Sequence, residues 1–232
     1  MPSKLQLFAL PFAGGNAASF RNLESLLSPY IEWITIEYAG RGNRRKEGYI
    51  TDYDDFLKDV ADQVRARRNP SADFALFGYS LGSALTYDLL ARGMVEGCPV
   101  HAFICARGSL QHNVIGQSFT QMSEQDFAER MRKLGGMDER ILNNPRFLHI
   151  YIQPVRADYI IWGQYRFHPG EMGCDTSILY SPLDPVSQGV EDWTELTNGK
   201  VDYFPMGDNH FFIHQHWQDV AEIVNRHLLP YR

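Results

Sequence analysis

Short apolar runs alternate along the chain with segments in which apolar residues recur at helical spacing. Residues 4–12, 33–42 and 74–80 are apolar runs that proline, glycine or serine ends, and such runs are typical of buried strands. Residues 18–30 and 52–68 place apolar side chains three and four positions apart, as amphipathic helices do. Because strand and helix alternate, we expect an α/β fold with a mostly parallel central sheet flanked by helices.

The same pattern returns in the second half of the chain. Three further apolar runs are predicted strands, at residues 101–109, 176–184 and 200–210. An amphipathic helix predicted at residues 214–229 closes the chain. The later strands end in polar residues, which a parallel sheet would present along one edge.

One segment interrupts the alternation. Residues 111–167 contain two helical patterns and no evident strand, with breaks expected at Gly135, Gly136, Pro145 and Pro154. We interpret this segment as a helical lid inserted into a single domain that spans residues 1–232. The alternative is an extra helical layer packed onto the fold.

Composition narrows the class of protein. The 232 residues with 44% hydrophobic content suffice for one buried core, and the net charge of -6 lacks the basic excess that nucleic-acid binding requires. No apolar run approaches the roughly 20 residues that span a bilayer, and the N-terminus shows no cleavage site. The three cysteines are odd in number and lie in mixed apolar surroundings, so we expect small buried side chains with reduced thiols rather than a disulfide framework. We therefore expect a cytoplasmic monomer with no nucleic-acid or membrane partner.

The segment Gly78-Tyr79-Ser80-Leu81-Gly82 joins a predicted strand to a predicted helix. A serine on such a sharp turn projects its hydroxyl above the sheet, and glycines two positions to either side leave room for the backbone. This arrangement is the nucleophile elbow of α/β-hydrolases, so Ser80 is the candidate nucleophile. The alternative is a structural serine in a glycine-containing turn.

A serine nucleophile needs a histidine base that an acid orients, and in hydrolases the chain order is serine, acid, histidine. His210 follows the last predicted strand, where a loop can present it, and is the candidate base. Together with His214 and His216 it superficially resembles a metal cluster. That cluster would need a helix that begins before His210, and Gly207 and Asn209 indicate a loop there, so we expect no metal site.

Asp184 is the candidate acid because it ends a predicted strand and precedes Pro185 in a turn. The other aspartates in this region lie before or within a strand, in the following helix, or too close to His210: Asp175, Asp202, Asp192 and Asp208. The alternative role for Asp184 is to cap the turn.

The oxyanion of an acyl-transfer intermediate needs two N–H donors. One is normally the residue after the nucleophile, here Leu81, and the other comes from the loop after an early strand. Phe12 or Ala13 can supply the second, since Gly14 and Gly15 let the backbone come close. A simple strand-to-helix turn is the alternative for this glycine pair, which lacks the spacing of nucleotide-binding motifs.

Blocks spread over nearly the whole chain resemble, in order, the type II thioesterases that accompany nonribosomal peptide and polyketide synthases: LFALPFAGGNAASFRNL, YAGRGNRRKE, LFGYSLGSALTYDLLAR, KLGGMDERIL, VRADY and GDNHFFI. The resemblance implies an α/β-hydrolase with a helical lid, which removes aberrant or stalled acyl groups from the phosphopantetheine arm of acyl or peptidyl carrier proteins. By position, it assigns the nucleophile to Ser80, the acid to Asp184, the base to His210, and the oxyanion amides to Ala13 and Leu81. It implies no cofactor in this chain, because the partner carries the phosphopantetheine.

Three positions depart from the family pattern. Tyr79 stands where a histidine usually precedes the nucleophile, YSPLD replaces a strand that usually ends in glycines, and GDNHFFI replaces Gly-Gly-His. These departures alter the pocket floor and the loops that carry the acid and the base. They leave the reacting groups in place.

Carrier docking and two alternative functions stay open at this point. The densest basic group is a candidate docking surface for an acidic carrier, with a solvated basic loop as the alternative: Arg41, Arg44, Arg45 and Lys46. A fatty-acid chain-release thioesterase or a general carboxylesterase would use the same triad. A binding module that retains the hydrolase fold without catalysis is the alternative from a different class.

Overall fold

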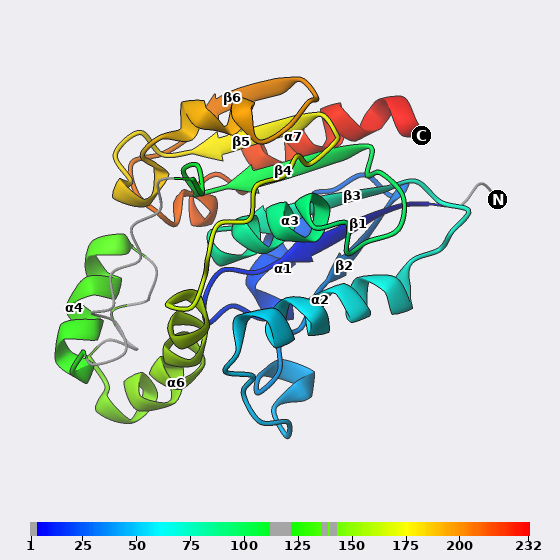
Figure 1. Ribbon diagram of the computed structural model, residues 1–232. Coiled ribbons are helices and arrows are strands. Elements are labelled where there is room, and N and C mark those ends of the chain that lie inside the picture. The colour runs from blue at the N-terminus through cyan, green and yellow to red at the C-terminus, as the bar shows by residue number, and fades with distance from the viewer. Residues whose placement is uncertain (1–3, 112–121, 136–138, 140–142) are drawn as a thin grey trace.

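The computed structural model describes residues 4–111, 122–135, 139 and 143–232. Within them, six strands form one sheet in the order β2-β1-β3-β4-β5-β6, and every neighbouring pair is parallel (Figure 1). The strands are β1 (Leu5–Leu10), β2 (Ile31–Thr35), β3 (Phe74–Tyr79), β4 (His101–Cys105), β5 (Thr176–Tyr180) and β6 (Val201–Pro205). The expectation of a parallel sheet is confirmed.

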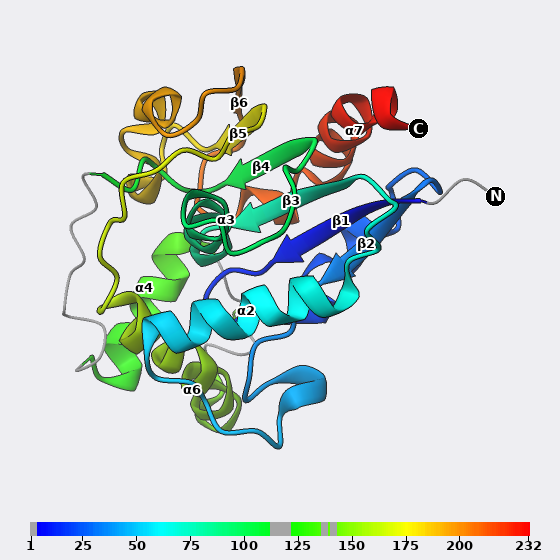
Figure 2. The same ribbon diagram turned by 45° about the vertical axis from the view of Figure 1, so that its right-hand side comes forward.

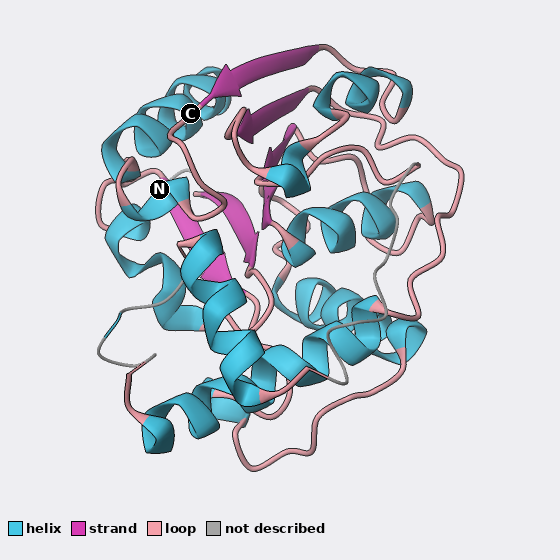
Figure 3. Cartoon of the chain, turned by 90° about the vertical axis from the view of Figure 1, so that its left-hand side faces the viewer, coloured by secondary structure: helices cyan, strands magenta, loops and turns pink. Residues whose placement is uncertain are grey.

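Helices cover both faces of this sheet, as Figure 3 shows. They are α1 (Arg21–Glu24) and α7 (Trp217–Leu228) on one face, and α2 (Tyr53–Arg67) and α3 (Leu81–Ala91) on the other. Successive residues of β1 point to opposite faces, so Leu7 packs in the first layer and Phe8 in the second. Both layers are apolar because a parallel sheet is buried on its two sides.

Several elements are shorter than their sequence patterns, among them the strands predicted at 101–109, 176–184 and 200–210, which end at Cys105, Tyr180 and Pro205. Of the predicted helix at 18–30, only a 3-10 turn at Ala17–Phe20 and α1 form, and Pro29 disfavours helical backbone at the residue before it. Of the predicted strand at 33–42, β2 keeps only the part up to Thr35. Its neighbour β1 ends just before Pro11, which has no N–H to extend the ladder.

The predicted insertion contributes α4 (Glu124–Leu134) and α6 (Pro145–Trp162), which lie beyond the carboxyl ends of the strands (Figures 1 and 2). Gly135 ends α4 in the left-handed conformation and Pro145 begins α6, as expected. The break expected at Pro154 is wrong, since α6 continues through it. Its neighbours Ile152 and Val155 are buried, so packing holds the helix despite the missing N–H.

Several sequence features of the insertion lie outside the described residues. These are residues 112–121, 136–138 and 140–142, with Gly136 and part of the KLGGMDERIL block. Cys105 and Cys174 are buried as expected, whereas the expectation is wrong for Cys98, which is exposed. In the part of the chain that the structure describes, no helix has both the length and the apolar character needed to cross a membrane.

Candidate active site

The backbone of Ser80 is strained at the junction of β3 and α3. Its φ of 55° is positive, a conformation that among the described non-glycine residues only Ala106 shares. The Ser80 N–H donates to the carbonyl of Cys105 over 2.8 Å, and the Ser83 hydroxyl contacts the same carbonyl and that of Gly78. These bonds hold the elbow so that the Ser80 side chain projects at the carboxyl edge of the sheet.

The glycines around Ser80 are explained by close backbone contacts. A Cβ atom at Gly82 would collide with the carbonyl of Leu10 in β1, and one at Gly78 would collide with the carbonyl of Gly82. Helix α3 can therefore approach the strands only if both positions lack a side chain. The turn that the sequence predicted is thus required by packing.

Ser80, His210 and Asp184 come together from the ends of β3, β6 and β5. The distance between His210 Nε2 and Ser80 Oγ is 3.0 Å, and that between His210 Nδ1 and Asp184 Oδ2 is 2.6 Å. His210 and Asp184 are 5% and 3% exposed. Because the Asp184 carboxylate can only accept a hydrogen bond, the imidazole proton sits on Nδ1. Nε2 is then free to accept the serine proton.

The loop of Asp184 holds its carboxylate at both oxygens. Oδ1 accepts the Val186 N–H over 2.9 Å, and Oδ2 accepts the Ser187 hydroxyl over 3.1 Å. Asp184 therefore caps this turn, the alternative role that the sequence left open, and contacts His210 as well. Pro185 begins the 3-10 turn at Pro185–Ser187 that makes this capping possible.

The candidate oxyanion donors lie in the loop after β1 and at the start of α3. The N–H groups of Gly14 and Gly15 are occupied, by Asp158 Oδ2 and by the Phe12 carbonyl. Within the described structure, the Ala13 and Leu81 N–H groups have no hydrogen-bond partner. Ala13 and Leu81 are therefore available to an incoming oxyanion, and Phe12 remains the alternative to Ala13.

Tyr79 has a role at the site that the sequence did not reveal. Its hydroxyl donates to the backbone carbonyl of His210 over 2.7 Å, and its ring stacks on Phe211. Complete burial raises the pKa of Tyr79 well above its ordinary value, so the hydroxyl keeps its proton. The resemblance led us to expect a histidine here, so the sequence identified Tyr79 as unusual. It did not predict the contact with the His210 carbonyl.

A second buried serine–histidine pair lies elsewhere in the sheet. His101 Nε2 is 2.8 Å from Ser177 Oγ, but His101 begins β4 and thus lies at the edge opposite to Ser80. Among the described residues, no carboxylate is paired with its other ring nitrogen. Burial, reinforced by the nearby His227, lowers the pKa of His101 to about 4. This pair lacks the third member that a base requires.

The other histidines near His210 have partners of their own. His214 stacks on Phe211, and His216 contacts Asp219 over 2.8 Å. The described residues include no group of three or more histidine, cysteine or acidic side chains that could hold a metal ion.

The prediction that four neighbouring cations form a basic docking surface is wrong. Arg41 is only 6% exposed and is paired with Asp158. Arg44 is neutralised by ion pairs with Asp59 and Glu47, each 2.6 Å long. Of the four predicted cations, Arg45 and Lys46 alone remain exposed without a described partner.

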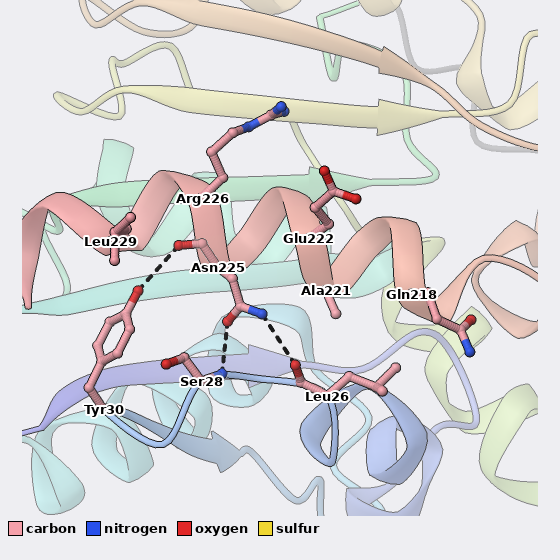
Figure 4. Close-up of a pocket in the computed structure, with 9 residues that line it drawn as sticks. All are labelled: Leu26, Ser28, Tyr30, Gln218, Ala221, Glu222, Asn225, Arg226 and Leu229. Atoms are coloured by element: carbon pink, nitrogen blue, oxygen red, sulfur yellow. Dashed lines mark hydrogen bonds between the residues drawn. The ribbon is translucent and has the colours of Figure 1, made fainter.

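A surface pocket of about 500 Å³ lies away from Ser80, between α7 and the segment before β2 (Figure 4). Asn225 spans it, donating to the Leu26 carbonyl and accepting from the Ser28 N–H. Tyr30 and Leu229 place this pocket at the amino-terminal edge of the sheet. It takes no part in the arrangement around Ser80.

Comparisons with known proteins agree with the fold and the site. The thioesterase domain family matches residues 5–228. The gramicidin S biosynthesis protein GrsT of Aneurinibacillus migulanus is 26% identical, covering 97% of this chain and 90% of its own. The thioesterase PikA5 of Streptomyces venezuelae is also 26% identical, covering 99% of this chain and 83% of its own.

Solved structures give the same result. The type II thioesterase BorB from the borrelidin biosynthetic cluster has a TM-score of 0.87 at 27% identity, covering 98% of this chain and 94% of its own. ClbQ from the colibactin NRPS/PKS pathway has a TM-score of 0.85 at 26% identity, covering 99% and 98%. Because the family match extends over nearly the whole chain, this protein belongs to the thioesterase family and has the α/β-hydrolase fold.

Proposed function

We propose that this chain is a serine thioesterase that hydrolyses acyl thioesters on the phosphopantetheine arm of carrier proteins. Its task would be to remove aberrant or stalled acyl groups in nonribosomal peptide or polyketide biosynthesis. The observation that carries the proposal is the contact chain from Ser80 through His210 to Asp184 in a thioesterase-family fold. The names of the relatives, which include a gramicidin S biosynthesis protein and a borrelidin-cluster thioesterase, support the carrier-bound substrate.

The proposed reaction has two steps. His210 Nε2 takes the proton of the Ser80 hydroxyl as its oxygen attacks the thioester carbonyl, and the carbon–sulfur bond breaks after His210 protonates the departing thiol. Water, deprotonated by His210, then attacks the acyl-serine and releases a carboxylic acid and free Ser80. Asp184 holds the histidine tautomer and offsets the charge of the imidazolium.

In each step a carbonyl oxygen becomes an oxyanion. The N–H groups of Ala13 and Leu81 would stabilise it, and one such donor is worth about 100- to 1,000-fold in kcat. No cofactor in this chain is needed, because the phosphopantetheine belongs to the carrier. We further propose that the protein acts as a cytoplasmic monomer and that α4 and α6 belong to a lid over this site.

The test is a panel of acyl groups on a purified carrier protein, with Ser80→Ala as the control. We expect hydrolysis of short acyl groups on the carrier and a loss of at least about 10,000-fold in the variant. Preference for long-chain acyl groups would favour a fatty-acid chain-release thioesterase, and preference for oxygen esters a carboxylesterase. Hydrolysis by Ser80→Ala at the wild-type rate would refute the mechanism.

Reaction with a serine-directed fluorophosphonate tests the remaining alternative. We expect labelling of the wild-type protein at Ser80 and none of the Ser80→Ala variant. A wild-type protein that neither reacts with this probe nor hydrolyses any thioester would instead be a binding module.

Carrier docking can be tested at the two cations that stay exposed. Reversing both charges, in Arg45→Glu with Lys46→Glu, should slow hydrolysis of a carrier-bound acyl group more than that of a small soluble thioester. The matched control is Lys58→Glu with Arg65→Glu, which reverses two exposed cations on α2. If the charge reversal changes the rates on the two substrates by the same factor, docking lies elsewhere.

A further inference from the structure

A buried ion pair connects helix α6 to the segment after β2. Arg41 Nη2 lies 2.5 Å from Asp158 Oδ1, and Arg41 Nη1 lies 2.6 Å from Asp158 Oδ2. The side chains are 6% and 0% exposed. A bidentate contact of this kind has a fixed geometry, so it holds α6 in one orientation above the carboxyl edge of the sheet.

The same carboxylate also contacts the loop after β1 that carries Ala13 and Gly14, which we call the oxyanion loop. Gly14 N–H donates to Asp158 Oδ2 over 2.7 Å, and Arg41 Nη1 approaches the Gly15 carbonyl at 3.5 Å. Gly14 has a φ of +80°, and Val155, one turn before Asp158 on α6, occupies the space that a Cβ atom at Gly14 would need. Helix α6 therefore holds this loop by a hydrogen bond and by packing.

The hydrogen bond between Gly14 and Asp158 lies next to Ala13, the candidate oxyanion donor. The Gly14 N–H belongs to the peptide unit that follows Ala13, so its direction restricts the backbone rotation at Ala13 and thereby the aim of the Ala13 N–H. It also occupies a neighbouring donor that would otherwise compete for the oxyanion. Oxyanion donors act only when they point in advance to where the charge develops.

We propose that Asp158, held by Arg41, is a positioning residue that aims the Ala13 N–H at the oxyanion. This inference rests on the proposed thioesterase function, and it makes the proposed lid helix part of the catalytic apparatus. In this role Asp158 acts through the Gly14 N–H and does not contact the substrate. The alternative role for the pair is to hold α6 in place without any effect on the loop.

Two neutral double variants separate these roles. Arg41→Met with Asp158→Asn keeps an oxygen that can accept from Gly14, whereas Arg41→Met with Asp158→Leu replaces it with an apolar group of similar size. Both lose the ion pair without leaving an unpaired buried charge. We expect kcat to be about 100-fold lower in the leucine variant than in the asparagine variant, with a similar KM. The leucine variant should also have a lower Tm, because the Gly14 N–H loses its acceptor.

The pH profile distinguishes positioning from damage to the base. In the leucine variant the plateau of kcat/KM should fall, while the midpoint of its pH dependence should stay at the wild-type value. Equal kcat in the two folded variants would overturn the proposal. A wild-type protein that hydrolyses no thioester would overturn the proposed function instead.

If neither double variant folds, Asp158→Glu provides the second test. It keeps the charge opposite Arg41 but displaces the oxygen that accepts from Gly14. We expect a folded protein in which kcat is at least about 10-fold lower. Wild-type kcat in this variant would contradict the proposal.

Discussion

Tyr79 shows how one side chain connects the candidate nucleophile to the candidate base. It directly precedes Ser80, and its hydroxyl holds the carbonyl of His210, so it restrains the loop that presents the imidazole. Its ring also makes an edge contact with Phe12 in the oxyanion loop. The histidine that the family resemblance leads us to expect at this position has a smaller ring and no hydroxyl to donate to the His210 carbonyl.

We predict that Tyr79→Phe lowers both stability and activity. The His210 carbonyl would lose its buried donor, at a cost of about 1–3 kcal/mol in the free energy of unfolding. A loosened base loop should lower kcat by roughly 10-fold. Urea unfolding and steady-state kinetics measure the two effects.

Tyr87→Phe is the matched control for this variant. The Tyr87 hydroxyl also donates to backbone carbonyls, those of His168 and Gly170, and neither carbonyl belongs to a loop that carries Asp184 or His210. It should lose stability and keep kcat. Equal kcat in both variants would mean that the Tyr79 hydroxyl does not restrain the base.

Asp184→Asn tests the acid, for which the sequence offered several rivals. An amide cannot hold His210 in the required tautomer, so kcat should fall by about 10,000-fold. The control is Asp208→Asn, because Asp208 is exposed and close to His210 in sequence. Activity lost in Asp208→Asn and kept in Asp184→Asn would reverse the assignment.

At the scale of elements, helix α6 rests on two buried arginines of opposite character. Arg41 is neutralised by Asp158, whereas Arg107 stacks on Trp162 at 4.1 Å with no carboxylate partner among the described residues. Burial lowers the pKa of Arg107 to about 10, a sign that its charge costs free energy where it lies. The two contacts therefore contribute differently to stability.

We predict that Arg41→Met and Arg107→Met differ strongly in stability. Removing Arg41 leaves the Asp158 carboxylate buried and unpaired, which should cost about 3–5 kcal/mol. Removing Arg107 exchanges a cation–π contact for relief of a buried charge, and the net change should stay within about 1 kcal/mol. Urea unfolding of both variants measures this, and equal losses would mean that Asp158 is satisfied without Arg41.

For the whole molecule, the buried pair of His101 and Ser177 makes stability depend on pH. The unfolded chain binds a proton at His101 below about pH 6.5, whereas the folded protein binds it only near pH 4. The free energy of unfolding therefore decreases as the pH falls through this window and levels off below it.

At pH 4.5 the contribution of His101 to this loss should be about 2–3 kcal/mol. His101→Gln cannot titrate, so its stability should fall less than that of the wild type between pH 7 and pH 4.5. His168→Gln, at an exposed position, should follow the wild type. Parallel curves for all three proteins in urea unfolding would show that His101 does not contribute.

The order of elements and the candidate catalytic residues were predictable because their signals are local. The apolar period predicted the alternation of strand and helix, and the glycines around Ser80 predicted a tight turn. The chain order of a hydrolase then led to Asp184 and His210. Where local signals conflicted, as at Pro154 and Pro29, packing decided the first and the restricted backbone before proline the second.

The sequence by itself therefore determined the α/β fold class and selected Ser80, Asp184 and His210 as candidates, which the structure brings into contact. Only the tertiary structure decided which charges are neutralised and which amides are free. The Arg41–Asp158 and Tyr79–His210 contacts join residues 117 and 131 positions apart. No local pattern specifies such partners, because burial brings the segments together and then favours pairing between the polar groups that it removes from water.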